Sequence, residues 1–178
     1  MDQAEYDFFC SHFKPMILKK KSFYVEPGAL CRHKAYVNKG CLRSFVTDKN
    51  GNERILFFPM EDWWITDIDS YFSGSEATTF VQALEDCQLF EISKSDFDML
   101  ENKIQKLKSW YSLKLSRHAS KTIKRIEEIK TLSPQERYLN LLQTNSEIFQ
   151  RVPLQHIASF LNIEPQSLSR MRKRLSKQ

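Results

Sequence analysis

Apolar residues recur along the chain at spacings that change twice. Near the N-terminus, Tyr6, Phe9 and Phe13 lie three or four positions apart, which predicts a short amphipathic helix over residues 4–13. Residues 16–93 then contain short runs of β-branched and aromatic side chains, separated by turn-forming Gly, Pro, Asn and Asp. Helical spacing returns beyond that segment and continues toward the C-terminus.

The middle segment predicts an antiparallel β-roll or sandwich. Its apolar runs are short, lie at near-regular intervals and have no helical pattern between them. The pair Asn50-Gly51 separates two of these runs and suits a tight hairpin turn. The expected strand runs cover residues 22–30, 34–48, 53–59, 78–84 and 87–93.

A long helix is expected over residues 102–130. Its apolar side chains recur every three or four positions for more than three turns, and such a stripe favours packing against a second helix. We therefore expect a homodimer formed through this helix. The alternative is that the stripe covers the chain's own β-domain, and a helix of this length could do both. The expected dimer contacts are Tyr111, Leu115, Ala119, Thr122 and Ile126.

A new unit starts near residue 132. Ser133, Pro134 and Glu136 have the order of a capping box, with Ser as the cap, Pro at the first helical position and Glu at the third. These signals divide the chain into a β-rich domain with flanking helices over 1–101, a central helix over 102–131 and a helical domain over 132–178.

The helical domain ends in two helices joined by a short turn. Residues 154–161 have helical spacing, Asn162 accepts the left-handed conformation of a helix end, and Pro165 suits the start of a second helix. This order predicts a helix-turn-helix. On a helical wheel, residues 165–175 separate apolar from polar side chains. The inward face holds Leu168, Met171 and Leu175, and the outward face holds Gln166, Arg170, Lys173 and Lys177, flanked by Ser167 and Arg174.

Excess basic residues are concentrated at this end. The chain has a formal net charge of +5, and residues 151–178 account for all of it. A neutral body with one basic end favours a local anionic partner. Arg and Gln side chains can bind guanine and adenine edges, while Ser and Lys bind phosphates, so the preceding helix and turn favour DNA over a merely solvated cationic helix. Arg172 lies near the apolar side, where the pattern does not explain it.

Candidate catalytic and metal-binding groups are scattered. The four cysteines form no CxxC pair, so we expect small buried hydrophobic side chains rather than a metal site, with a redox-sensing thiol as the alternative. The four histidines lie in separate segments, and no catalytic triad or paired-carboxylate spacing occurs. We therefore expect no enzyme activity, no cofactor and no metal. The residues concerned are Cys10, Cys31, Cys41, Cys87, His12, His33, His118 and His156.

No apolar run reaches the roughly 20 residues that cross a bilayer. The acidic, interrupted N-terminal residues also lack the basic-then-apolar layout of a signal peptide. A cytoplasmic protein without a membrane partner is expected.

Two motifs together resemble the Crp/Fnr superfamily of bacterial transcription regulators. Residues 37–59, VNKGCLRSFVTDKNGNERILFFP, are similar to a hairpin of its cyclic-nucleotide-binding-type β-roll. Residues 157–175, IASFLNIEPQSLSRMRKRL, are similar to its DNA-reading unit. The resemblance covers nearly the whole chain and implies an α+β fold. An antiparallel β-roll (a double-stranded β-helix) would precede a long dimerisation helix and a C-terminal helix-turn-helix.

The resemblance also implies partners and contacts. A homodimer would bind near-palindromic double-stranded DNA and work with RNA polymerase, under the control of an unidentified small-molecule effector if one exists. Gln166 and Arg170 match positions that contact base edges, and Ser167 and Ser169 lie near phosphate-contacting positions. Lys173 and Arg174, from the helical wheel, complete the expected DNA contacts.

The ligand cassette departs from the family pattern. Asp67 and its neighbours replace Gly-Glu-Leu, and Ala77-Thr78 replaces the Arg-Ser or Arg-Thr of nucleotide-binding members. A buried cyclic phosphate without its arginine is strongly disfavoured, so cyclic AMP binding is not expected. Asp67, Thr78 and Thr79 remain candidate contacts to another ligand. A second departure is that no clear β-hairpin wing is expected after the recognition helix.

Two other classes of function stay open. A cupin-type enzyme or ligand-binding protein would use a similar β-roll, but it needs clustered His and acidic metal ligands. A ligand-sensing or protein-docking module would use the aromatic segment 57–72, whose rings either line a pocket or pack as core. The rings concerned are Trp63, Trp64, Tyr71 and Phe72, and the nearby acids Asp62, Asp67 and Asp69 form a candidate cation site with solvated loop acids as the alternative.

Overall fold

Two four-stranded antiparallel sheets form the β-roll of the computed structural model, which describes residues 2–175. One sheet has the order β1-β8-β3-β6 and the other has the order β2-β7-β4-β5. The strands are β1 (Lys14–Leu18), β2 (Phe23–Val25), β3 (His33–Lys39), β4 (Leu42–Thr47), β5 (Glu53–Phe57), β6 (Trp64–Ile65), β7 (Phe80–Ala83) and β8 (Cys87–Ser93). The antiparallel β-architecture expected from the sequence is thus present.

The hairpin between β4 and β5 is confirmed, and its turn has a clear local cause. The carboxylate of Asp48 accepts hydrogen bonds from the backbone N–H groups of Asn50 and Asn52, 2.9 and 3.0 Å away. Gly51 supplies a φ of +82°, a conformation that side-chain-bearing residues rarely adopt. The turn fixes the register in which Thr47 lies opposite Glu53.

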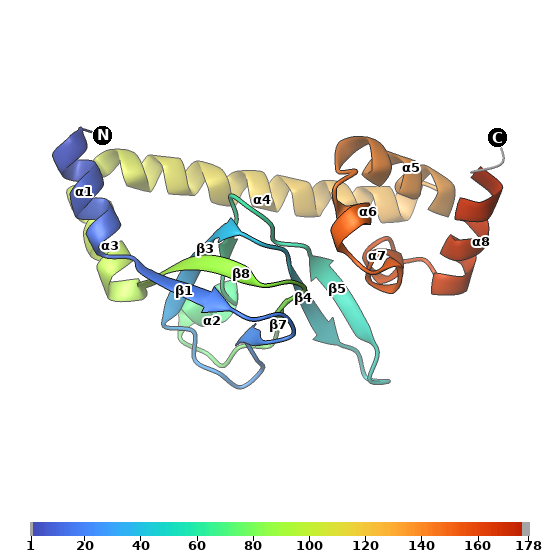
Figure 1. The fold of residues 1–178 in the computed structure, drawn as a ribbon, viewed down its shortest axis with the longest axis horizontal. Coiled ribbons are helices and arrows are strands. Elements are labelled where there is room, and N and C mark those ends of the chain that lie inside the picture. The colour runs from blue at the N-terminus through green and yellow to red at the C-terminus, as the bar shows by residue number, and fades with distance from the viewer. Residues whose placement is uncertain (1, 176–178) are drawn as a thin grey trace.

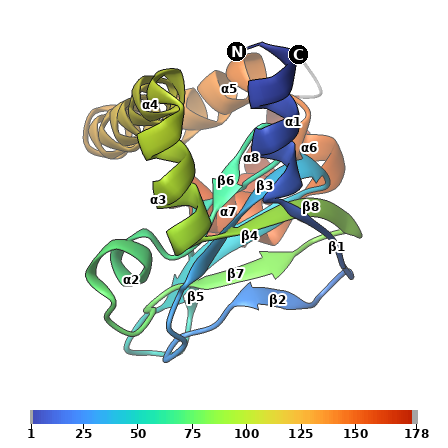
Figure 2. The ribbon, with the colours of Figure 1, turned by 90° about the vertical axis from the view of Figure 1, so that its left-hand side faces the viewer.

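Figure 1 shows the long helix α4 lying along the β-roll, with the C-terminal helices beyond one end of it. Seen end-on, α1 and α3 lie on the same side of the roll as α4 (Figure 2). The helices are α1 (Gln3–Ser11), α2 (Ile68–Ser73), α3 (Lys94–Lys103), α4 (Gln105–Thr131), α5 (Pro134–Thr144), α6 (Ile148–Arg151), α7 (Leu154–Phe160) and α8 (Pro165–Leu175). The capping box at Ser133 and Glu136 is confirmed at the start of α5.

The apolar stripe of α4 is divided between two environments. Ile104, Leu107 and Tyr111 are buried in a cluster with Phe97 of α3, so this end of the stripe covers the chain's own roll. Tyr111 is only 7% exposed, so little of its side chain is left to contact a second chain.

The other expected contacts on α4 differ among themselves. Leu115 and Thr122 are half-buried, whereas Ala119 and Ile126 are exposed. Ile123, which the expected stripe omitted, is 57% exposed. Positions 119, 123 and 126 share one side of the helix because they are three or four residues apart. The exposed apolar face of α4 therefore includes Ala119 and Ile126 of the predicted face and adds Ile123 at its side.

Candidate nucleic-acid interface

Helices α7 and α8 pack through small and apolar side chains. Ile157 and Ala158 of α7 and Leu168 of α8 are each at most 1% exposed within one hydrophobic cluster. Between the helices, Asn162 has a φ of +53°, which confirms its expected left-handed conformation. The N–H of Ile163 donates to the carbonyl of Ala158 at 2.9 Å and closes the turn.

Helix α8 has one buried and one exposed face, as its wheel predicts. Leu168 and Met171 are buried and Leu175 is half-buried, so the apolar side is held against the rest of the unit. The six residues expected to contact DNA are all exposed: Gln166, Ser167, Ser169, Arg170, Lys173 and Arg174. The arrangement presents cations and hydrogen-bonding groups on a single helical surface.

Two arginines lie at the edge of this surface, near α5. Arg174 donates to Oε1 of Gln135 at 2.9 Å, so its guanidinium is turned toward the flank of α8. Arg172, on the apolar side of the helix, lines a groove with Tyr138 and Leu142. Lys177, expected on the outward face, lies outside the described residues.

Polar contacts join the C-terminal helices to the β-roll. Arg151, at the end of α6, forms ion pairs with Glu61 and Glu85 of the roll and with Glu147, the residue before α6. The hydrogen bond from Arg151, helped by one from the N–H of Gly40, lowers the pKa of Glu61 to about 2. In α7, Oγ of Ser159 accepts from the N–H of Ile55 at 3.1 Å, in the middle of β5. The helical end is therefore held in a defined place against the roll.

The candidate ligand residues Asp67, Thr78 and Thr79 lie together, but they form hydrogen bonds with one another. The carboxylate of Asp67 accepts hydrogen bonds from the N–H groups of Ser70, Thr78 and Thr79 and from the Thr79 hydroxyl. Although burial opposes its charge, these donors hold the pKa of Asp67 below its ordinary value. Ala77 is buried, and residues 66–79 contain no Lys or Arg. The Asp67 carboxylate thus occupies the donors that an incoming anion would need.

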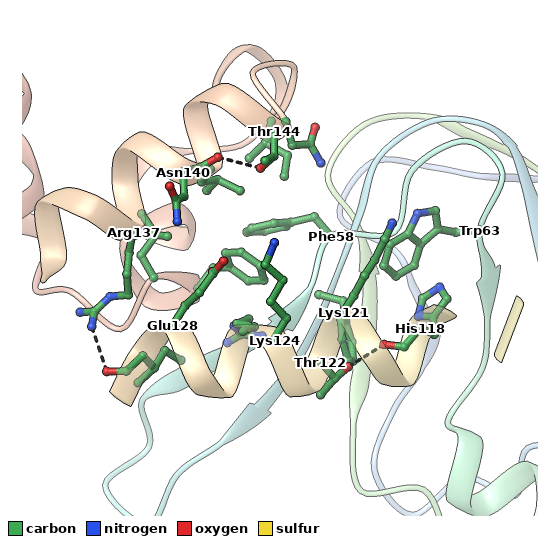
Figure 3. Close-up of a pocket in the computed structure, with 18 residues that line it drawn as sticks. Phe58, Trp63, His118, Lys121, Thr122, Lys124, Glu128, Arg137, Asn140 and Thr144 are labelled. Carbon is green, nitrogen blue, oxygen red and sulfur yellow. Dashed lines mark hydrogen bonds between the residues drawn. The ribbon is translucent and has the colours of Figure 1, made fainter. Parts of the chain in front are cut away.

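The aromatic segment serves two roles. Trp64 contacts Phe97 and Tyr111 in the core, with ring centres 5.5 and 5.8 Å apart. Trp63 instead packs edge-on against His118 of α4, with ring centres 4.0 Å apart. Together, Trp63 and His118 form part of the wall of a cavity of about 370 Å³ between the roll, α4 and α5 (Figure 3).

The three acids proposed as a cation site do not gather. Asp62 accepts a hydrogen bond from the hydroxyl of Tyr36 at 2.6 Å and lies 3.6 Å from the ammonium of Lys114. The carboxylate of Asp67 already accepts the hydrogen bonds described above, and Asp69 is exposed. Across residues 2–175, no group of three or more His, Cys, Asp and Glu is placed to hold a metal ion. Within the same residues, no helix combines the length and apolarity needed to cross a membrane.

The β-roll and its surroundings match known proteins at the level of a domain and a fold. Residues 16–103 match the family of cyclic nucleotide-binding domains. No curated protein matches the chain by sequence. The remaining similarity is to solved structures.

Two of the similar structures are described as regulators, one of them as a transcriptional regulator of the Crp/Fnr family. The global regulator CLP of Xanthomonas campestris, described as responsive to c-di-GMP, has a TM-score of 0.80 and 16% identity, covering 99% of this chain and 92% of its own. FixK2 of Bradyrhizobium japonicum has a TM-score of 0.78 and 13% identity, covering 93% and 85%. A protein of Eubacterium rectale assigned to the Crp/Fnr family of transcriptional regulators has a TM-score of 0.74 and 16% identity, covering 99% and 84%. At these identities the likeness establishes the fold.

Proposed function

We propose that the protein is a cytoplasmic, homodimeric transcription regulator of Crp/Fnr type that binds specific DNA sequences. The observation that carries the proposal is α8, whose apolar side is buried while Gln166, Arg170 and Lys173 are exposed together. A helix of this kind fits the major groove, where side chains reach base edges. The chain's whole excess of positive charge lies in residues 151–178 and would attract the phosphate backbone.

The roles of the side chains follow from their chemistry. Arg170 can donate two hydrogen bonds to guanine, and Gln166 can pair with adenine. Ser167, Ser169 and Lys173 would hold phosphates, which position the helix without reading sequence. Arg174, already bonded to Gln135, would add a phosphate contact at the flank.

A homodimer would present two such helices to one duplex. Its contact would use the exposed face of α4 that carries Ala119, Ile123 and Ile126, rather than the side that covers the roll. Two recognition helices would then enter successive major grooves about 34 Å apart on a near-palindromic site. RNA polymerase is the expected further partner of the complex.

The β-roll is proposed as a sensor domain that does not bind cyclic AMP. Its cassette contains no basic side chain to neutralise a cyclic phosphate, and Asp67 fills the cluster of donors. The cupin-type alternative receives no support from the arrangement of His and acidic side chains among residues 2–175.

Selection from random duplexes tests the proposal. The purified protein would be used to enrich bound DNA, and the selected sequences would then be titrated by fluorescence anisotropy against shuffled duplexes at about 150 mM salt. We expect two related half-sites separated by one helical turn and at least ~1,000-fold preference over shuffled DNA. Equal affinity for selected and shuffled duplexes would exclude a sequence-specific regulator.

A further inference from the structure

The cavity between the β-roll, α4 and the C-terminal helices has the chemistry of a ligand site. Its volume of about 370 Å³ is within the range of roughly 300–1,000 Å³ that small-molecule sites occupy. Its walls come from the roll, from α4 and from the helices beyond α4 (Figure 3). The Asp67 cassette and the exposed face of α8 take no part in it.

Positive charge gathers around this cavity. Lys121, Lys124, Arg125 and Arg137 line it, with Glu128 as the only carboxylate in the lining. Within residues 2–175, no ion pair joins any of the four cations to a carboxylate. Figure 3 shows Lys121 and Lys124 rising from α4, with the ammonium of Lys121 next to Trp63. The cavity lining therefore carries four cationic side chains against one carboxylate, an excess of positive charge.

The two arginines are fixed by backbone carbonyls, which carry no net charge. Arg125 donates to the carbonyls of Ile55 and Leu56 in β5. Arg137 donates to three carbonyls, two at the end of α4 and that of Asn162. Nε of each arginine is buried and has no hydrogen-bond partner, and Arg137 is only 8% exposed. Pairing with an anion would supply the negative charge that the carbonyls lack.

Aromatic rings form the apolar part of the same wall. Phe57, Phe58, Trp63 and Phe160 all line the cavity. The guanidinium of Arg125 lies 4.1 Å from the centre of the Phe160 ring, so cationic and aromatic surfaces are in direct contact. Such rings offer faces and edges on which a planar ligand can pack.

We infer that this cavity binds a small aromatic anion, namely a planar ring system that carries a phosphate or carboxylate group. The anionic group pairs with the lysine and arginine side chains, and the ring packs against the aromatic wall. Because the walls belong to both the roll and the C-terminal helices, the bound molecule holds these parts together. Its effect on DNA affinity rests on the proposed function, whereas its binding does not.

Isothermal titration calorimetry with the full-length protein tests the site. The probes are phenyl phosphate, benzoate and adenosine 5′-monophosphate, with inorganic phosphate and phenol as the separate halves of an aromatic anion. We expect saturable one-site binding of at least one aromatic anion, at least ~10-fold tighter than either half, since both kinds of contact contribute. Tighter binding of the phosphate esters indicates a phosphate-bearing ligand, and tighter binding of benzoate indicates a carboxylate-bearing one. No binding of any aromatic anion at millimolar concentration overturns the inference.

Paired variants locate the binding. The double substitution Lys121→Ala and Lys124→Ala removes two exposed cavity cations and is expected to weaken the best probe at least ~10-fold. The matched control, Lys108→Ala with Lys130→Ala, removes two exposed lysines of the same helix that do not line the cavity. The control is expected to bind as the parent does. Equal affinity of the cavity variant and its control for the probe contradicts the site. This outcome is independent of DNA binding, and hence of the proposed function.

Discussion

The ammonium nitrogen of Lys34 lies 3.0 Å from the centre of the Phe97 ring and has no hydrogen-bond acceptor. Tyr111 of α4 contributes a second ring whose centre is 3.6 Å away. Lys34 is 1% exposed, and burial lowers its pKa to about 7, although the nearby acids Glu101 and Asp98 oppose this shift. Lys34 thus lies where β3, α3 and α4 meet, and the nearest groups that stabilise its charge are aromatic faces.

Lys34 makes stability depend on pH in a defined direction. Because its folded pKa is below the ordinary value of 10.5, the unfolded chain binds more protons between about pH 7 and that value. The free energy of unfolding should therefore rise from pH 7 to pH 9 in the parent relative to Lys34→Met. Urea unfolding at both pH values measures the difference. Lys39→Met, an exposed change on the same strand, should keep the parent's slope.

Asp67 is predicted to be structural. Its replacement by Ala leaves three backbone N–H groups and one hydroxyl without their acceptor, and should lower the free energy of unfolding by about 1–3 kcal/mol. Asp69→Ala, an exposed change in α2, should have little effect. Thermal and urea unfolding compare the two variants. Similar stability of both would show that the hydrogen bonds of Asp67 contribute little.

Arg151 is predicted to make the protein acid-sensitive. Arg151 keeps the pKa of Glu61 at about 2, so the stabilisation is fully present above the ordinary pKa of 4.5 and is lost as the pH falls toward 2. Arg151→Met should therefore lower stability at pH 6 and flatten the decline below pH 4.5. Thermal melts between pH 3 and 6 test this, with Lys49→Met as an exposed control. A decline as steep in Arg151→Met as in the parent would contradict the prediction.

The exposed face of α4 is predicted to hold the dimer together. Ile123→Glu places a charge in an apolar contact and should convert the dimer to a monomer, which light scattering after size-exclusion chromatography measures directly. Ile17→Glu is the matched control, because Ile17 is 58% exposed on β1. A dimer that survives Ile123→Glu would exclude this face as the contact.

Two changes on α8 separate sequence reading from general attraction. Arg170→Ala should cost about 1–3 kcal/mol on a selected duplex and reduce discrimination at one base position. Lys173→Ala should weaken binding to selected and shuffled duplexes alike and lower the salt dependence. Anisotropy titrations at two salt concentrations distinguish these outcomes. Identical effects of the two variants on every duplex would contradict the assigned roles.

Local signals made much of the fold predictable. The turn at Gly51, the capping box at Ser133 and the left-handed Asn162 each depend on side chains within a few residues, so their chemistry is visible in the sequence. The separation of Leu168 from Arg170 on α8 also follows from helical geometry alone. From these signals, the exposure of the candidate DNA-contacting residues on α8 was predicted correctly.

Long-range contacts account for what the sequence did not reveal. Periodicity identified an apolar face on α4, but whether the roll or a second chain covers Tyr111 depends on where α3 packs. Strand β6 has two residues and exists through its pairing with Ala35 and Tyr36 of β3. The cavity cations Lys121 and Arg137 belong to different helices, and no spacing signals their convergence.

The contacts of β5 have a consequence for self-association. β5 is an edge strand of its sheet, and Ser159 of α7 and Arg125 of α4 bind backbone groups of Ile55 along that edge. Unpaired strand edges are templates on which other chains add strands and aggregate. Release of the C-terminal helices would remove the hydroxyl of Ser159 from this edge. The attachment that positions α8 therefore also protects the protein against intermolecular β-pairing.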